Sequence, residues 1–151
     1  MEIKKYSIAV ALVFWNALAF AQPTTFNPEK GVNVTLIQDE AGLTVTSESK
    51  GRSRTETISF ETEKTLNIEI DDFNFDGFKD FSAWHIDDGM GTYAIHRIFI
   101  YQTVDGSFKE LAPACGDEFI NLKRDAAKKV LNSTYYEDNQ PKLCVTKPPR
   151  Q

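Results

Sequence analysis

Hydrophobic and polar residues alternate along most of the chain after residue 30, which is the pattern of strands with one buried face. The alternation is clear at residues 32–36 and 43–45, where it predicts an antiparallel hairpin, and turn-forming residues separate one run from the next. Residues 95–101 are rich in β-favouring side chains and predict the clearest strand of all. Further strands are expected at residues 58–60, 66–70, 81–86 and 108–111.

The last third of the chain mixes helix-forming and strand-forming residues. Asp125 to Lys129 favours a helix, whereas the flanking Phe-Ile-Asn-Leu and Val-Leu-Asn-Ser-Thr-Tyr-Tyr runs favour strands. We interpret residues 118–131 as two strands joined by a short turn. A final strand pair is expected from residues 130–136 and 143–146.

These elements predict an all-β fold, an antiparallel β-meander closed as a small β-sandwich or as propeller-like blades. One β domain is expected at residues 31–146, after an N-terminal linker at 22–30 and before a frayed tail at 147–151. The polar runs 49–54 and 137–142 are expected to be turns. No second domain is indicated.

One stretch, D-F-N-F-D-G-F-K-D at residues 72–80, brings oxygen ligands together at alternate positions. Gly77 permits a sharp turn, and a set made only of oxygen atoms selects a hard cation such as calcium. The expected calcium ligands are the side chains of Asp72, Asn74, Asp76 and Asp80 and the backbone carbonyl of Phe78.

The calcium loop departs from an EF-hand, because Ala83 stands where that motif has its bidentate Glu. Strand patterns on both sides predict that the loop joins two strands and that its ion is structural. The alternative is a plain turn, because Asp, Asn and Gly also bond to their own backbone without a metal.

The N-terminus predicts export. Lys4 and Lys5 precede an apolar run that ends in Ala-Phe-Ala, the pattern of a secretory signal peptide at residues 1–21, cleaved after Ala21. A periplasmic or secreted protein is therefore expected, with a retained membrane anchor as the alternative. In an oxidising compartment the two cysteines, Cys115 and Cys144, are expected to form a disulfide bond.

Composition narrows the function classes. The formal charge of −5 at pH 7 disfavours nucleic acid as a partner and suits a basic protein. His85 and His96 lie in strand patterns, and the sequence has no HExxH motif and no nucleophile elbow. We therefore expect a binding protein and not an enzyme.

The calcium loop resembles the D-x-N-x-D-G-x-x-D element of FG-GAP-type calcium-binding β-blades. The order of signal peptide, β-rich half, this loop, a Gly-containing segment, an aromatic strand, a D-G turn and an F-K-E-L strand resembles the periplasmic immunity proteins that inhibit lysozyme-like effectors of antibacterial type IV secretion. The resemblance covers roughly residues 66–145. It implies a lysozyme-like or other peptidoglycan-degrading enzyme as the partner. The chain departs from that family by ending early, with its cysteine pair.

The best candidate for partner contacts is the Gly-rich segment after the calcium loop, residues 87–93. Its acids suit a basic target, its glycines allow the backbone to protrude, and its tyrosine is a rigid anchor. The expected contact residues are Asp87, Asp88, Gly89, Gly91 and Tyr93. The alternatives are a plain hairpin connection and, for the whole protein, a calcium-dependent carbohydrate- or peptidoglycan-binding adhesive module.

Overall fold

A computed structural model describes residues 22–39 and 42–150 of the chain. The expected signal peptide lies outside the described residues. The described part is all-β, as expected, and it contains no helix long and apolar enough to span a bilayer. Its strands are β1 (Thr24–Phe26), β2 (Val32–Asp39), β3 (Gly42–Ser49), β4 (Arg52–Ile58), β5 (Asn67–Asp71), β6 (Asp80–Ile86), β7 (Ala94–Tyr101), β8 (Phe108–Leu111), β9 (Phe119–Asp125), β10 (Val130–Glu137) and β11 (Gln140–Thr146).

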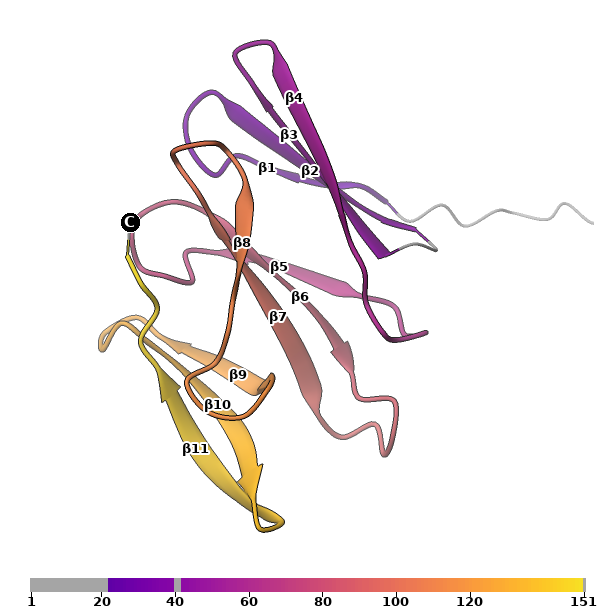
Figure 1. Ribbon diagram of the computed structural model, residues 1–151, viewed down its shortest axis with the longest axis vertical. Coiled ribbons are helices and arrows are strands. Elements are labelled where there is room, and N and C mark those ends of the chain that lie inside the picture. Colours follow the sequence, from indigo (N-terminus) through magenta and orange to yellow (C-terminus); the bar gives the residue numbers. More distant parts are fainter. Residues whose placement is uncertain (1–21, 40–41, 151) are drawn as a thin grey trace, which may run out of the picture.

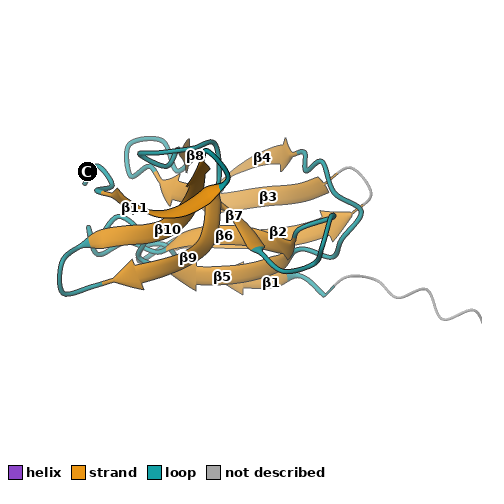
Figure 2. Cartoon of the chain, turned by 90° about the horizontal axis from the view of Figure 1, so that it is seen from below, coloured by secondary structure: helices purple, strands orange, loops and turns teal. Residues whose placement is uncertain are grey.

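The strands form two antiparallel sheets. The first has four strands in the order β1-β2-β3-β4, and the second runs β11-β10-β9-β7-β6-β5, with β8 also paired to β7. Figure 1 shows β1 to β4 at the upper end of the molecule, β5 to β8 in the middle and β9 to β11 at the lower end. Figure 2 shows the same strands from below. The arrangement is that of a small β-sandwich.

Strand β7 organises the second sheet, because one of its edges serves two partners. Its C-terminal half pairs with β8, from Ile98↔Leu111 to Tyr101↔Phe108. Its N-terminal half pairs with β9, through Ile95↔Ile120. The sheet therefore divides along β7.

Two hydrophobic cores follow from this division. The larger lies between the two sheets and joins side chains such as Val34 and Leu43 of the first sheet to Phe81, Phe99 and Tyr101 of the second. The smaller comprises the buried side chains Phe73, Ile98, Ile100, Phe119 and Leu131. Its members at 98 and 100 alternate with Phe99 and Tyr101 of the larger core, so the two faces of β7 serve different cores.

The expected strand at residues 58–60 and the expected turn at 49–54 were placed wrongly. The turn consists of Lys50 and Gly51, with φ of 48° and 74°, and β4 starts at Arg52. Two positive φ values are typical of the tight type I′ hairpin turn. Strand β4 has mostly polar, exposed residues and lies at the edge of its sheet, so hydrophobic alternation does not reveal it.

Both ends of the domain carry more strand than expected. Strand β1 lies within the expected linker and pairs with β2, and the Phe26 ring packs against those of Phe81 and Phe108 at 6.4 and 6.1 Å between centroids. Strand β11 begins at Gln140, because Asp138 and Asn139 alone make the turn, with φ of 50° and 58°. Residues 118–131 form parts of two strands joined by a short turn, as expected.

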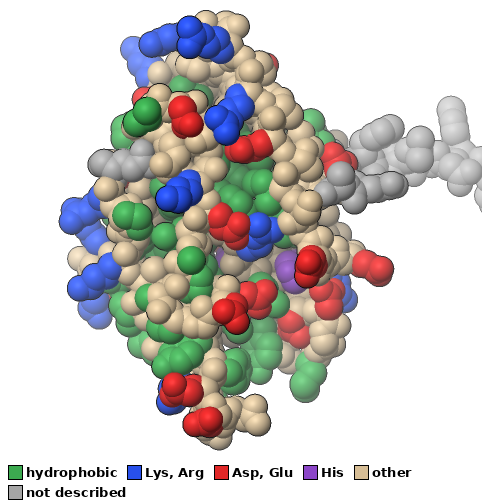
Figure 3. All heavy atoms as spheres, viewed as in Figure 1, with side chains coloured by type: hydrophobic (Ala, Val, Ile, Leu, Met, Phe, Trp, Pro, Cys, Tyr) green, Lys and Arg blue, Asp and Glu red, His purple; other side chains and the backbone are tan. Residues whose placement is uncertain are grey.

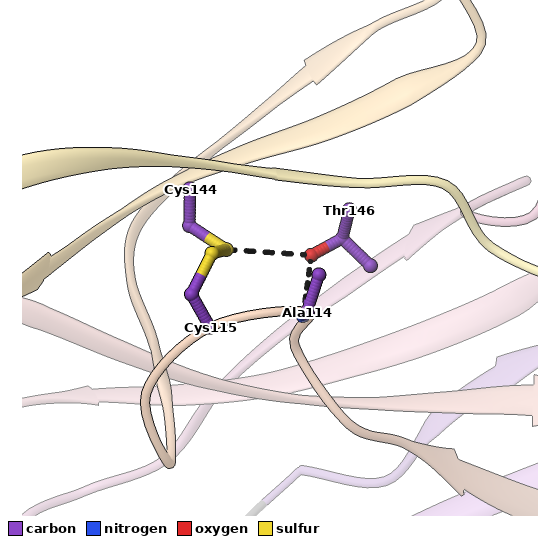
Figure 4. The surroundings of a disulfide bond; sticks show 4 residues. All are labelled: Ala114, Cys115, Cys144 and Thr146. Carbon is purple, nitrogen blue, oxygen red and sulfur yellow. Dashed lines mark hydrogen bonds between the residues drawn. A yellow bond between two sulfur atoms is a disulfide. The ribbon is translucent and has the colours of Figure 1, made fainter.

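The predicted disulfide is confirmed. Cys115 and Cys144 are bonded, with 5.8 Å between their Cα atoms. The backbone N–H of Ala114 donates to the Thr146 hydroxyl at 3.0 Å, so the segment after β8 is held to the edge strand β11 twice (Figure 4). Closing a loop of about 30 residues stabilises the fold by roughly 3 to 4 kcal/mol on the chain-entropy account.

Candidate functional site

The predicted calcium loop joins β5 to β6, as expected from the strand patterns on both sides. It lies between the two cores, because Phe73 is buried in the smaller core and Phe78 packs against the larger one. Gly77 has a φ of +99°, which glycine adopts without strain, and Phe75 has a φ of +62°. A positive φ is uncommon for an aromatic residue and persists only where surrounding contacts impose it.

Hydrogen bonds bring three of the four predicted side-chain ligands together in one turn. The Asp72 carboxylate accepts the backbone N–H groups of Asp76 and Gly77 at 3.1 and 2.8 Å. The Asp76 carboxylate accepts the Phe78 backbone N–H at 3.0 Å and the Asn74 side-chain amide at 2.6 Å. The loop is thus wound tightly, with its carboxylates turned toward the chain.

Asp80, the fourth side-chain ligand expected, is fully buried at the start of β6. Its carboxylate accepts the backbone N–H groups of Phe73, Asn74 and Tyr101 at 2.8, 3.3 and 2.9 Å. Burial raises the pKa of Asp80 to about 7, and the three backbone donors oppose that rise. The side chain ties the loop to the end of β7.

The chemistry of the loop fits a hard cation, but the arrangement of its side chains is that of a hydrogen-bonded turn. No group of three or more His, Cys, Asp or Glu side chains poised for a metal occurs within residues 22–39 and 42–150. Asn74 directs its amide nitrogen at Asp76, whereas a cation would require its amide oxygen. Each carboxylate oxygen has two lone pairs, so those that accept a single N–H retain one for a cation.

The sequence did not reveal the residues that brace the loop from outside. The Arg124 guanidinium of β9 donates to both carboxylate oxygens of Asp71, at 2.7 and 3.0 Å, and lies 5.3 Å from the Phe75 ring centroid. A bidentate pair of this kind fixes geometry as well as charge. The residues lie 53 positions apart, and only the pairing of β9 beside β7 brings them together.

The predicted partner segment forms the connection between β6 and β7. Asp87 organises the backbone of this connection, because its carboxylate accepts the N–H groups of Gly91, Thr92 and Tyr93 at 3.1, 2.7 and 2.7 Å. These bonds, with that of Tyr93 first, lower the pKa of Asp87. Asp87 therefore shapes the backbone of the connection.

The outward part of this connection is its tip. Met90 is 86% exposed, and Gly89 and Asp88 beside it are also exposed. Asp88 accepts the Thr62 hydroxyl at 3.1 Å. Tyr93 is half-buried and packs edge-on against Tyr136 of β10 at 5.8 Å between ring centroids. The sequence reasoning missed Met90, although a large apolar side chain between two glycines is a signal for it.

The two histidines have structural partners. Buried His96 lies 3.1 Å from the Ser82 hydroxyl through Nδ1, and its ring stacks on Trp84. Burial lowers the pKa of His96 to about 4. His85 Nδ1 lies 3.0 Å from the carbonyl of the next residue.

Comparison with protein-family models, curated proteins and solved structures finds no match. The fold and the loops therefore define this chain only as a disulfide-bonded β-sandwich protein with an acidic turn and a projecting hairpin.

Proposed function

We propose that this is an exported, calcium-stabilised binding protein that inhibits a lysozyme-like or other cell-wall-degrading enzyme. The observation that carries the proposal is the β6–β7 connection, an exposed tip mounted on an ordered base. Three backbone bonds to Asp87 hold the base, while Met90 is almost fully exposed. A pre-ordered loop loses little conformational entropy when it enters a partner's cleft.

The charge of this region supports a basic partner. Asp88 stands exposed beside Met90, and the chain carries a formal charge of −5. An acidic surface accelerates encounter with a basic protein and disfavours acidic competitors. The partner side of the proposal also rests on the resemblance to lysozyme-inhibiting immunity proteins.

Calcium is assigned a structural part in this proposal. The residues that would hold it are Asp72, Asn74, Asp76, Asp80 and the carbonyl of Phe78. An ion there would offset the repulsion among these carboxylates and fix a loop that joins both cores. It would leave the β6–β7 connection free for the partner.

The carbohydrate-binding alternative has less support. That alternative rests on the aromatic residues around the calcium loop, which could stack on sugars. Phe73 and Phe81 are instead buried in the two cores, with 1% and 0% exposure. Trp84 is half-buried against His96.

The calcium assignment is tested by thermal unfolding with calcium and with chelator. Calcium at about 100 times its dissociation constant should stabilise the protein by about 2.7 kcal/mol, and Asp76→Ala should abolish that gain. Asp87→Ala removes one acidic group outside the calcium loop, and this variant should retain the calcium-induced stabilisation. An equal calcium-induced rise in Tm in both variants would remove calcium from the proposal.

The partner assignment is tested by binding to a panel of lysozyme-like enzymes. Met90→Glu should weaken binding and leave Tm unchanged, because the side chain is 86% exposed. Val104→Glu makes the same chemical change at the 95%-exposed tip of the β7–β8 turn and should bind normally. Full binding by the Met90 variant would exclude this loop as the contact.

A further inference from the structure

The core-facing side of the first sheet changes from apolar to polar and charged residues along its length. Residues directly opposite each other in an antiparallel pair share a face. Ser47 and Ser49 stand opposite Val34 and Val32 of β2, and opposite Arg54 and Arg52 of β4. Beyond the buried valines, the face that forms the sandwich core therefore continues into hydroxyl and guanidinium groups.

Positively charged residues at core-facing positions are unusual, because burial of an unpaired charge is costly. Here the second sheet does not close over them, and a cleft of about 780 Å³ remains between this face and the β7–β8 turn. Four cationic side chains line it: Lys30, Lys50, Arg52 and Arg54. Figure 3 shows Lys and Arg side chains gathered at the end of the molecule where β3 turns into β4.

Most of these cations lack an anionic partner. Arg54 lies 3.6 Å from Asp105 and 3.8 Å from Glu56, so its charge is partly balanced. Lys30, Lys50 and Arg52 form no ion pair with any residue that the structure describes. Glu29 also lines the cleft and accepts the Tyr101 hydroxyl at 2.8 Å. The cleft thus has a positive excess within an acidic protein.

We propose that this cleft binds a flexible anionic ligand that carries two or more neighbouring phosphate or carboxylate groups. The side chains of Arg52 and Arg54 leave β4 on the same face, about 7 Å apart along the strand, a spacing that suits consecutive charged groups better than one small ion. Guanidinium forks bind both oxyanions in bidentate fashion, and the serine hydroxyls add donors. No residue of the β6–β7 connection lines the cleft, and the β3–β4 and β7–β8 turns that border it lie toward the other end of the molecule from that connection (Figure 1).

Fluorescence anisotropy at low salt, with calcium present, tests this assignment. Labelled tetrathymidylate supplies phosphodiester groups and labelled tetraglutamate supplies carboxylates, so the two probes distinguish the sources of the anion. The double variant Lys50→Gln/Arg52→Gln should weaken the binding of at least one probe by about tenfold or more. Neither side chain has an ion pair to lose, so the Tm should not change.

The matched control is Lys123→Gln/Lys147→Gln, which removes the same charge at exposed positions outside the cleft. It should bind both probes as the wild type does. Arg52→Lys keeps the charge but loses the fork, and should give an intermediate affinity. Absence of saturable binding by the wild type, or equal weakening in the control, would overturn the proposal.

Discussion

Phe73 offers the sharpest test of how the calcium loop is built into the fold. It belongs to the loop, yet its ring is 1% exposed and packs in the smaller core with Ile98, Phe119 and Leu131. Replacing a buried Phe by Ala removes its transfer free energy and leaves a cavity. This costs about 3 to 5 kcal/mol. A domain of this size is stable by only about 5 to 15 kcal/mol.

The matched position is Phe75, two residues further on, which is half-buried beneath the Arg124 guanidinium. Urea unfolding, followed by far-ultraviolet circular dichroism in chelator, measures both variants without any contribution from calcium. Phe73→Ala should lower the free energy of unfolding at least twice as much as Phe75→Ala. Phe73→Leu, which fills part of the cavity, should fall between the wild type and Phe73→Ala.

A cost below about 1 kcal/mol for Phe73→Ala would show that the ring is not part of a packed core. Equal losses of stability in the two alanine variants would show the same. The loop would then be an appendage to the sandwich, and calcium bound there could not stabilise the whole domain.

Three further predictions concern other parts of the fold. The pKa of His96 is lowered to about 4, so its contribution to stability is present above pH 6.5 and is lost as the pH falls toward 4. The free energy of unfolding, measured with urea, should fall by at most about 3 kcal/mol over this range. His96→Gln should remove that part of the pH dependence. Replacing Cys115 and Cys144 by Ala should lower the free energy of unfolding by roughly 3 to 4 kcal/mol, and an unchanged urea midpoint would contradict the loop-closure argument. A Cβ on Gly42 would stand 2.2 Å from the carbonyl oxygen of Ile58, whereas one on Gly31 would meet nothing within 4 Å. Both residues have positive φ, so Gly42→Ala should lower Tm more than Gly31→Ala. Equal losses of Tm would show that the positive φ alone sets the cost.

Strands could be predicted wherever apolar residues mark a buried face. Residues 32–36 alternate between buried and more exposed positions, whereas residues 98–101 form a continuous apolar run because both faces of β7 are buried there. Both ranges, and residues 81–86, lie within strands of the structure. Strand β4 could not be found in this way, because an exposed edge strand has no hydrophobic period to detect. Thr24–Phe26 looked like a linker because its only core contact is the Phe26 ring, made with residues 55 or more positions away.

The candidate site could also be predicted only in part. The spacing in residues 72–80 is local, so the sequence could predict the turn and its oxygen-rich side chains. The backbone bonds that Asp87 accepts depend on the exact geometry of its loop, and the ion pair between Arg124 and Asp71 depends on the pairing of distant strands. The cationic cleft also escaped the sequence reading, because Arg52 and Arg54 share a face only once β4 is recognised as a strand.

Whether the β6–β7 connection blocks a wall-degrading enzyme can be measured from the rate at which such an enzyme clears a peptidoglycan suspension. With calcium present, the wild-type protein should abolish clearing by one enzyme of a lysozyme-like panel at a one-to-one ratio, and Val104→Glu should act equally well. Met90→Glu should leave the clearing rate close to that of the enzyme alone. Undiminished clearing by every enzyme of the panel, or full inhibition by Met90→Glu, would show that this connection does not block such an enzyme.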